Sequence, residues 1–217
     1  MIPQLAIRRH FLTLIHLLLS IVAAGGAVPE ALPTAVAMDA WHCAGPFKDA
    51  PFGSLVISSR HVFAPESEVL ACKNGLADLT KSYSSPPFPG YEELTSLAWV
   101  AHPEWSDGWR HFLPRGPAPS RHETVYLYRT LTAREATRVT MRLYAEDAVT
   151  VWLNGEQAGA AIRHYSPEHR PVAVVVPLNL QPGANRLLVK ITCLFGPHGF
   201  AFGLDGLTVT SPTLPGI

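Results

Sequence analysis

The amino-acid sequence predicts an all-β domain, an antiparallel β-sandwich of the jelly-roll type. Apolar and polar residues alternate with a period of two in several short runs between residues 125 and 204, as in strands with one buried face. Turn residues separate these runs. The clearest turn is Asn154-Gly155, a pair that favours the positive φ angles of a tight hairpin. Regularly spaced strands and turns of this kind indicate a sandwich or jelly roll.

The N-terminal segment has the order of a secretory signal: Arg8-Arg9, an uncharged apolar run over residues 11–24, then small residues. At about 14 residues the run is shorter than the ~20 needed to span a bilayer, which favours a cleaved signal over an uncleaved anchor. Cleavage after Ala27 and cleavage after Ala37 both fit. The paired arginines also resemble a twin-arginine export motif, with ordinary signal arginines as the alternative. We expect an exported protein, periplasmic, at the cell surface or secreted, without a membrane span after signal cleavage.

This signal sets the expected domain organisation. Residues 1–37 are signal peptide and linker, residues 38–211 the β-sandwich, and residues 212–217 a C-terminal tail. Pro29 and Pro33 indicate that the linker extends over residues 28–40, so order is expected to begin at Trp41. Residues 41–119 are irregular, with short apolar runs such as residues 55–57, and predict two or three strands joined by long loops.

The strand pattern is sharper from residue 125 onward. In the run that ends at Glu146, Arg142 and Tyr144 occupy alternate positions that should face water, and adjacent Glu146 and Asp147 should point to opposite faces of a strand. A turn is expected over residues 181–185. The residues expected on buried faces are Val125, Leu127, Leu131, Val139, Met141, Leu143, Ala145, Val149, Val151, Leu153, Val172, Val174, Val176, Leu178, Leu187, Val189, Ile191, Cys193, Phe200, Phe202 and Leu204.

Charge and motifs exclude several classes of function. The 17 basic and 17 acidic side chains balance, and no basic stripe is present, so we expect no nucleic-acid partner. The sequence has no phosphate loop, dinucleotide fingerprint, Gly-x-Ser-x-Gly motif or His-Glu-x-x-His motif. These absences favour a protein that is not an enzyme and that uses no cofactor.

The three cysteines suit an exported protein with one disulfide and one remaining thiol. Cys193 alternates with apolar residues and is expected in the core. Cys43 and Cys72 are then the expected pair, with three buried thiols as the alternative. Their spacing does not match a zinc site.

Several segments, taken in order, resemble galactose-binding-like jelly-roll domains. They resemble in particular the sugar-binding domain of family-two glycoside hydrolases and related modules of exported planctomycete-type proteins. The resemblance covers most of the chain after the signal and implies a sugar-binding β-sandwich. The segments are Trp41-His42-Cys43-Ala44-Gly45-Pro46-Phe47, Trp105-Ser106-Asp107-Gly108, Tyr126-Leu127-Tyr128-Arg129, residues 145–155, Arg163, residues 182–190 and Gly199-Phe200.

The resemblance departs from the family at one informative place. Such domains commonly carry Asp-Asp-Gly where this chain has Glu146-Asp147-Ala148. In related protective-antigen-type lectins a paired aspartate holds calcium, so the resemblance implies a structural calcium ion at Asp147 only if the substituted glutamate preserves the site. The alternative is that Asp147 caps a turn.

Five residues are the candidate ligand-binding set: Trp105, Trp109, Asp147, Asn154 and Arg163. Loop tryptophans can stack on sugar rings, and the three polar side chains can hydrogen-bond hydroxyl groups. Each has a structural alternative, namely loop anchor for the tryptophans, turn residue for Asp147 and Asn154, and exposed charge for Arg163. Trp152, which alternates with valines, is expected in the core rather than at a ligand.

The function favoured by these observations is that of an exported, non-catalytic module that binds carbohydrate weakly. The alternative is a structural or protein-interaction domain without sugar affinity, such as a spacer from a larger exported enzyme. A small glycoside hydrolase ranks third, because it needs two carboxylates that converge on a cleft.

Overall fold

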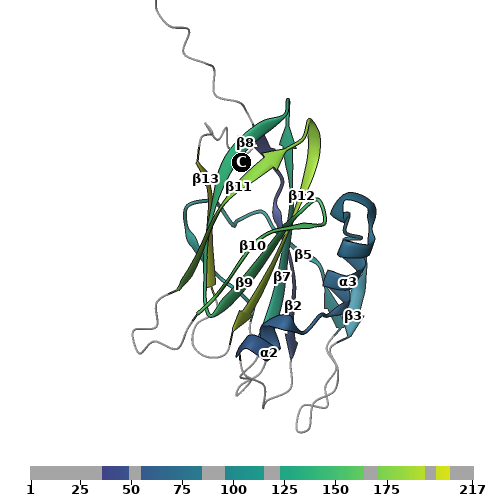
Figure 1. Cartoon of the computed structure of the whole chain (residues 1–217). Helices are drawn as coiled ribbons and strands as arrows, with labels where there is room; N and C mark the ends of the chain where they lie inside the picture. Colours follow the sequence, from purple (N-terminus) through teal and green to yellow (C-terminus); the bar gives the residue numbers. More distant parts are fainter. Residues whose placement is uncertain are drawn as a thin grey trace, which may run out of the picture. The chain divides into compact units, whose positions relative to one another are not determined.

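Two antiparallel sheets pack face to face in the computed structural model, which confirms the predicted all-β sandwich (Figure 1). The structure describes residues 36–48, 55–84, 96–114, 123–163, 171–193 and 199–205. All of them belong to one contact unit, Pro33–Ile217. The predicted signal, apart from residues 36 and 37, and the predicted tail lie outside the described residues.

The large sheet has the strand order β10-β9-β12-β7-β2-β5, and β1 pairs with β7. The long central strands β7 and β12 are in register from Gly183 opposite Ala133 to Cys193 opposite Glu123. The strands of this sheet are β1 (Val36–Met38), β2 (Trp41–Lys48), β5 (Val100–His102), β7 (Glu123–Ala133), β9 (Ala148–Leu153), β10 (Glu156–Ile162) and β12 (Gly183–Cys193).

The small sheet has the order β11-β8-β13-β6. Strand β8 lies between β11 and β13 and is paired along its full length with β11, from Val172 opposite Ala145 to Leu180 opposite Thr137. Its strands are β6 (Arg110–Phe112), β8 (Thr137–Ala145), β11 (Val172–Leu180) and β13 (Gly199–Asp205).

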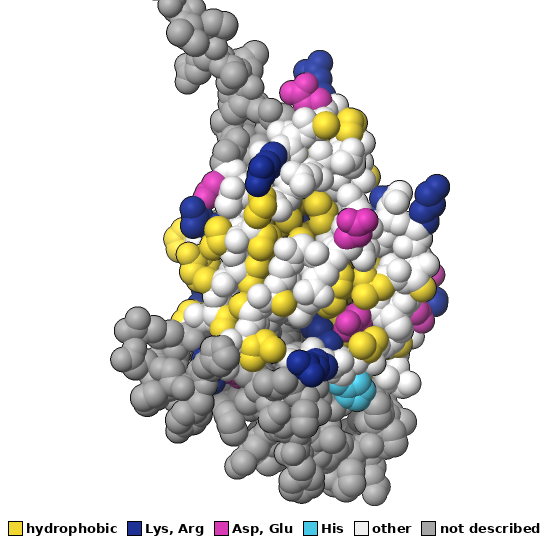
Figure 2. All heavy atoms as spheres, in the orientation of Figure 1, with side chains coloured by type: hydrophobic (Ala, Val, Ile, Leu, Met, Phe, Trp, Pro, Cys, Tyr) yellow, Lys and Arg dark blue, Asp and Glu magenta, His cyan; other side chains and the backbone are white. Residues whose placement is uncertain are grey.

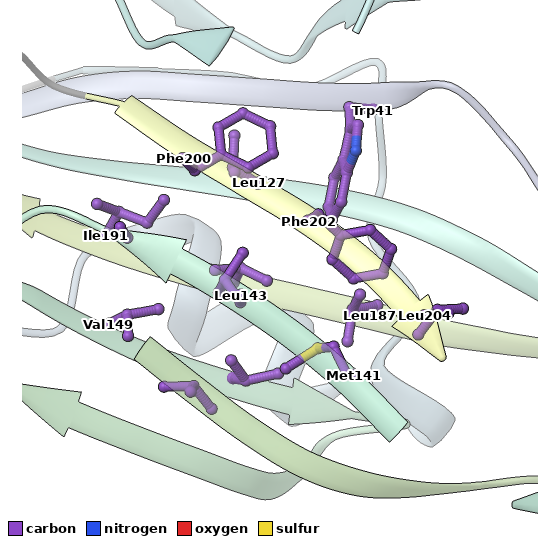
Figure 3. Close-up of a cluster of buried hydrophobic side chains, with 14 of the residues drawn as sticks. Trp41, Leu127, Met141, Leu143, Val149, Leu187, Ile191, Phe200, Phe202 and Leu204 are labelled. Carbon is purple, nitrogen blue, oxygen red and sulfur yellow. The ribbon is translucent and has the colours of Figure 1, made fainter. Parts of the chain in front are cut away.

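The main hydrophobic core fills the space between the two sheets (Figure 3). Strict alternation directs Leu127 of β7 and Met141 and Leu143 of β8 into this space, where each is fully buried. Trp41 packs edge-on against Phe200 and Phe202, with ring centroids 5.5 and 5.1 Å apart. Cys193 is buried in the same core, as predicted.

A second layer covers the outer face of the large sheet, on the side where Figure 1 draws α2, α3 and β3. Tyr126, Tyr128, Trp152 and Leu188 point into it from β7, β9 and β12 and form a second buried cluster. Because both faces are covered, these strands lose the clean alternation of a half-exposed sheet. The elements of this layer are α2 (Leu55–Arg60), α3 (Ala64–Ala71), the 3₁₀ turn η2 (Lys73–Gly75), β3 (Ser82–Ser84) and β4 (Ser96–Ala98).

The structure of residues 41–119 differs from the sequence prediction. We expected two or three strands there, whereas the described residues contain β2, β3, β4, β5 and β6 together with two short helices. Residues 55–57, a short apolar run in the segment where two or three strands were expected, begin α2. A three-residue apolar run suits a helix turn as well as a strand, and packing of α2 on β12 and β9 selects the helix.

A buried charge network fastens α3 to the large sheet. The Lys190 ammonium group lies 2.8 Å from the Glu66 carboxylate and also donates to the His61 carbonyl oxygen. The Tyr126 hydroxyl donates to the same carboxylate at 2.8 Å. Burial, reinforced by the Glu66 charge, raises the pKa of Tyr126. Each charged group has a partner, which offsets the large cost of removing it from water.

The predicted hairpin is confirmed. Asn154 and Gly155 have φ angles of 54° and 86° and connect β9 to β10. Both central residues of a type I′ turn need positive φ, which Asn and Gly adopt at the lowest cost.

Among the described residues, no helix is long and apolar enough to cross a membrane.

Strand β1 corrects the predicted linker. Residues 36–38, expected to belong to the linker over residues 28–40, pair with β7, and Val36 is 2% exposed. The pairing places Val36 opposite Ala133 in the main core. Cleavage after Ala37 would therefore remove a core residue, whereas cleavage after Ala27 would retain it.

A chain that begins at residue 38 should melt about 3–12 °C below one that begins at residue 33. Burial of one valine side chain contributes about 1.5–3 kcal/mol, and a domain of this size loses about 2–4 °C per kcal/mol. Differential scanning calorimetry of the two chains measures the difference. Equal melting temperatures would show that β1 adds no stability to the domain, as expected of a linker.

The predicted Cys43–Cys72 disulfide is wrong. Cys43 points into the core between the sheets, whereas Cys72 is exposed at the end of α3 on the other side of the large sheet, and both are thiols. The large sheet separates the two side chains, so no disulfide geometry is accessible. Burial raises the pKa of Cys43 to about 12.

Native protein should therefore react with a thiol reagent at Cys72 and remain unreactive at Cys43 at pH 8. The thiolate is the reactive form, and burial suppresses it at Cys43. Mass spectrometry after a short exposure to iodoacetamide, with and without denaturant, identifies the modified residue. A native protein in which Cys72 reacts only after reduction would show that the disulfide exists.

Candidate functional site

The outer face of the small sheet carries a shallow depression, called here the sheet-face hollow. Its volume is about 90 Å³, and β6, β8 and β13 supply most of its wall. Figure 2 shows one face of the molecule, on which hydrophobic side chains lie among scattered acidic and basic groups. The lining residues are Arg110, Tyr144, Ala145, Glu146, Pro171, Gly199, Phe200 and Ala201.

Small residues form the floor of the sheet-face hollow. The strand register places Ala201 of β13 between Arg110 of β6 and Tyr144 of β8, so two long side chains flank one methyl group. Gly199 is the next outward-facing residue of β13. A Cβ there would lie 3.0 Å from the Arg110 Nε. The glycine therefore allows the guanidinium group to lie close to the backbone.

Three aromatic side chains are exposed on this face or directly beside it. Tyr144 is 44% exposed in the centre of the sheet, and Phe112 is 68% exposed at the end of the edge strand β6. Trp109, which immediately precedes β6, is 71% exposed. The Arg110 guanidinium carbon lies 5.5 Å from the centre of the Phe112 ring. Grouped exposed apolar side chains mark interaction surfaces in soluble proteins.

The charges on this face occur in pairs. Arg110 donates to the Glu146 carboxylate at 2.6 Å at one end of the hollow. Farther along the sheet, Arg142 of β8 pairs with Asp205 of β13. The guanidinium groups are thereby neutralised, while their remaining N–H groups can still donate to a ligand. The hollow combines an aromatic wall with polar groups that carry little net charge.

The structure brings Asp147 and Arg163 together as an ion pair, outside the lining of the hollow. The Asp147 side chain is 1% exposed, and the Arg163 backbone N–H donates to the Asp147 carbonyl oxygen at 2.6 Å.

The prediction that Glu146 and Asp147 lie in a strand is wrong. They form the turn between β8 and β9, where Asp147 has φ 39°. Aspartate is among the residues that best tolerate this conformation.

The two loop tryptophans have different environments. Trp105 is half-buried, stacked 3.8 Å from the ring of His102 and 5.8 Å from that of His111, and it packs on the core. Asp107 in the same loop fixes the segment through an ion pair with buried Arg129 at 2.8 Å. Trp109 alone among the chain's five tryptophans is largely exposed. The structure therefore gives Trp105 the role of a loop anchor and leaves Trp109 open to solvent.

Trp152 is buried in the second cluster, as predicted. Asn154 lies far along the sheet from the hollow, at the opposite end of β9 from Asp147. Its side-chain amide donates to Asn185 at 3.1 Å, and its side-chain oxygen accepts from the Arg186 backbone N–H at 2.8 Å. These bonds hold the hairpin against β12.

Sequence reasoning missed three residues of the site: Arg110, Phe112 and Tyr144. The alternation in β8 did place Tyr144 on the solvent-facing side. A large aromatic side chain that faces water is informative, because such side chains are usually buried unless they belong to an interaction surface. Phe112 and Arg110 lie on a three-residue strand that shows no usable periodicity. Their place beside β13 follows from tertiary pairing alone.

The described residues contain no group of three or more His, Cys, Asp or Glu side chains arranged to hold a metal ion. The Asp147 carboxylate is engaged by Arg163, which a calcium ion would have to displace. Calcium at Asp147 remains a prediction.

No protein-family model and no curated protein matches the chain. Among solved structures, the A domain of epithelial adhesin 9 from Candida glabrata, in complex with Galβ1-4GlcNAc, is 12% identical, with 81% of this chain and 85% of that chain covered and a TM-score of 0.37. A β-glucosidase from Kluyveromyces marxianus is 18% identical, with 38% and 11% covered and a TM-score of 0.32. The PA14 domain of an antifreeze protein is 15% identical, with 45% and 50% covered and a TM-score of 0.34. The chain spans a small part of the β-glucosidase, and TM-scores this low support no argument about function.

Replacing Asp147 with alanine should lower the free energy of unfolding by about 3 kcal/mol, because it leaves Arg163 without its buried partner. Glu146→Ala is the matched control. It breaks a pair whose arginine is 51% exposed, so its cost should stay below about 1 kcal/mol. Urea unfolding followed by circular dichroism compares the two variants. Equal losses would contradict a structural role specific to Asp147.

Proposed function

We propose that the chain is an exported, non-catalytic module that binds carbohydrate weakly at the sheet-face hollow. The observation that carries this proposal is the exposed aromatic group on the outer face of the small sheet, flanked by the neutralised Arg110–Glu146 pair. The C–H face of a sugar ring stacks on an aromatic side chain, and its hydroxyl groups accept from and donate to such polar groups.

The shape of the site explains why binding is proposed to be weak. A volume of about 90 Å³ is far below the roughly 300–1,000 Å³ of pockets that enclose a small molecule. A shallow site contacts one face of its ligand and leaves the other in water. An extended polysaccharide fits such a surface better than a single enclosed sugar does, because it makes contacts along the whole sheet face.

The geometry of the sheet-face hollow supports a module without hydrolytic activity. Hydrolysis of a glycosidic bond uses two carboxylates about 5–9.5 Å apart on either side of the bond. Glu146 is the one carboxylate in the lining of the hollow as the structure describes it, and it is bound to Arg110. Neighbouring Asp147 is buried in its own ion pair. Incubation with polysaccharides should release no reducing ends.

Export is part of the proposal and rests on the N-terminal sequence, with its basic pair, apolar run and small residues. An exported module meets extracellular glycans, which agrees with the chemistry of the sheet-face hollow. N-terminal sequencing of the mature protein tests this part on its own.

Tyr144→Ala should weaken binding to neutral polysaccharides about twofold to tenfold, since an aromatic contact contributes about 0.5–1.5 kcal/mol. Affinity electrophoresis against xylan, glucan and galactomannan measures the change. Val62→Ala is the control, because Val62 is 52% exposed beside the helical layer, away from the small sheet. Unretarded migration of the unmodified protein in all three gels would favour the alternative, a structural or protein-interaction domain.

A further inference from the structure

The side-chain amides of this chain are concentrated in one place. The sequence contains four asparagines and three glutamines. Five of these seven residues line a single groove. A sixth, Asn185, accepts a hydrogen bond from one of the five, Asn154. The seventh, Gln4, lies outside the described residues. The groove, called here the amide groove, is bounded by the β9–β10 hairpin and the end of β11. Its lining residues are Asn74, Leu153, Asn154, Glu156, Gln157, Ala158, Pro177, Leu178, Asn179 and Gln181.

Backbone geometry makes one end of the amide groove rigid. Asn74 and Asn154 both have left-handed backbones, with φ angles of 58° and 54°. A Cβ on Gly75 would lie only 2.7 Å from the Gly155 nitrogen, so the η2 turn and the hairpin are packed backbone to backbone. The two asparagines are therefore held side by side before any ligand arrives.

A buried residue supports this end from below. The Asn185 side chain is fully buried and accepts from Asn154 at 3.1 Å. It is itself fixed by bonds to both the N–H and the carbonyl oxygen of Gln181, each 2.8 Å long. Supporting bonds of this kind keep the first layer of a binding site in place.

The groove retains hydrogen-bonding capacity. Within the described residues, the side chains of Asn74, Gln157, Asn179 and Gln181 make no hydrogen bond to protein. Turn geometry explains Asn74 and Asn154, but it does not explain three further amides on β10, β11 and the residue after β11. Each amide offers two donors and an acceptor to a ligand.

The charge and size of the groove limit the class of ligand. Glu156 is the sole charged residue among the described residues of its lining, and Leu153, Ala158, Pro177 and Leu178 supply apolar contacts. Its volume of about 490 Å³ is that of a small-molecule site. Several side-chain amides favour a ligand with many hydroxyl groups. The apolar floor and the small number of charged side chains favour a ligand without net charge.

We propose that the amide groove is a second binding site, specific for neutral oligosaccharides and separate from the sheet-face hollow. Pro171, at the start of β11, lines the hollow, and Pro177 to Gln181, at its end, line the groove. The two sites lie at opposite ends of one strand. A polysaccharide-binding module gains from two such sites, because two linked contacts bind more tightly than either alone.

The test is a titration of the ¹⁵N-labelled full chain with xylohexaose, cellohexaose and mannohexaose, followed by NMR of the side-chain NH₂ groups. At least one hexasaccharide should shift the NH₂ signals of Asn179, Gln157 and Gln181 in a saturable way. The double variant Asn179→Ala with Gln181→Ala should bind it about tenfold more weakly at the groove. Both residues are exposed, so the fold is retained.

Tyr144→Ala separates this inference from the proposed function. It should leave the NH₂ titration unchanged while it weakens binding at the sheet-face hollow. NH₂ signals that stay constant with all three hexasaccharides would overturn the second site, whether or not the hollow binds. Equal shifts with trigalacturonic acid would overturn its specificity for neutral ligands.

Discussion

Burial of the large sheet on both faces is the constraint on which the rest of the structure depends. Strands β7 and β12 send Leu127 and Leu187 into the core between the sheets and Tyr126 and Lys190 into the layer beneath the helices. The Lys190–Glu66 pair fastens that layer. Because helices and core cover this sheet, the described surface leaves the outer face of the small sheet as the sheet face open to a ligand.

Polar groups in this sandwich divide into those that hold the fold and those that face a ligand. Asp147 and Arg163 resemble binding residues in the sequence, yet each satisfies the other. Arg110 and Glu146 are also paired, but at the edge of a shallow hollow where part of the guanidinium group remains exposed. The distinction depends on burial, which a sequence does not show directly.

The sequence predicted the fold wherever the signal was local. The Asn154-Gly155 hairpin and the alternation that buries Met141 and Leu143 depend on neighbouring residues, and both are confirmed. The helix at residues 55–60 and the separation of Cys43 from Cys72 depend on packing between distant segments, and both were missed. The two candidate sites differ in the same way. The strand pattern alone indicates that Tyr144 faces solvent. The amide groove is formed by residues between positions 74 and 181 that only the tertiary structure brings together.

The most direct test of the central claim is the aromatic NMR spectrum of the protein during titration with xylohexaose, cellohexaose and mannohexaose. Carbohydrate recognition by the outer face of the small sheet should shift the ring signals of Tyr144 and Phe112 in a saturable way with at least one of them, while those of buried Trp41 and Trp99 stay constant. Saturable binding that leaves the Tyr144 and Phe112 rings unchanged would contradict carbohydrate recognition by the outer face of the small sheet.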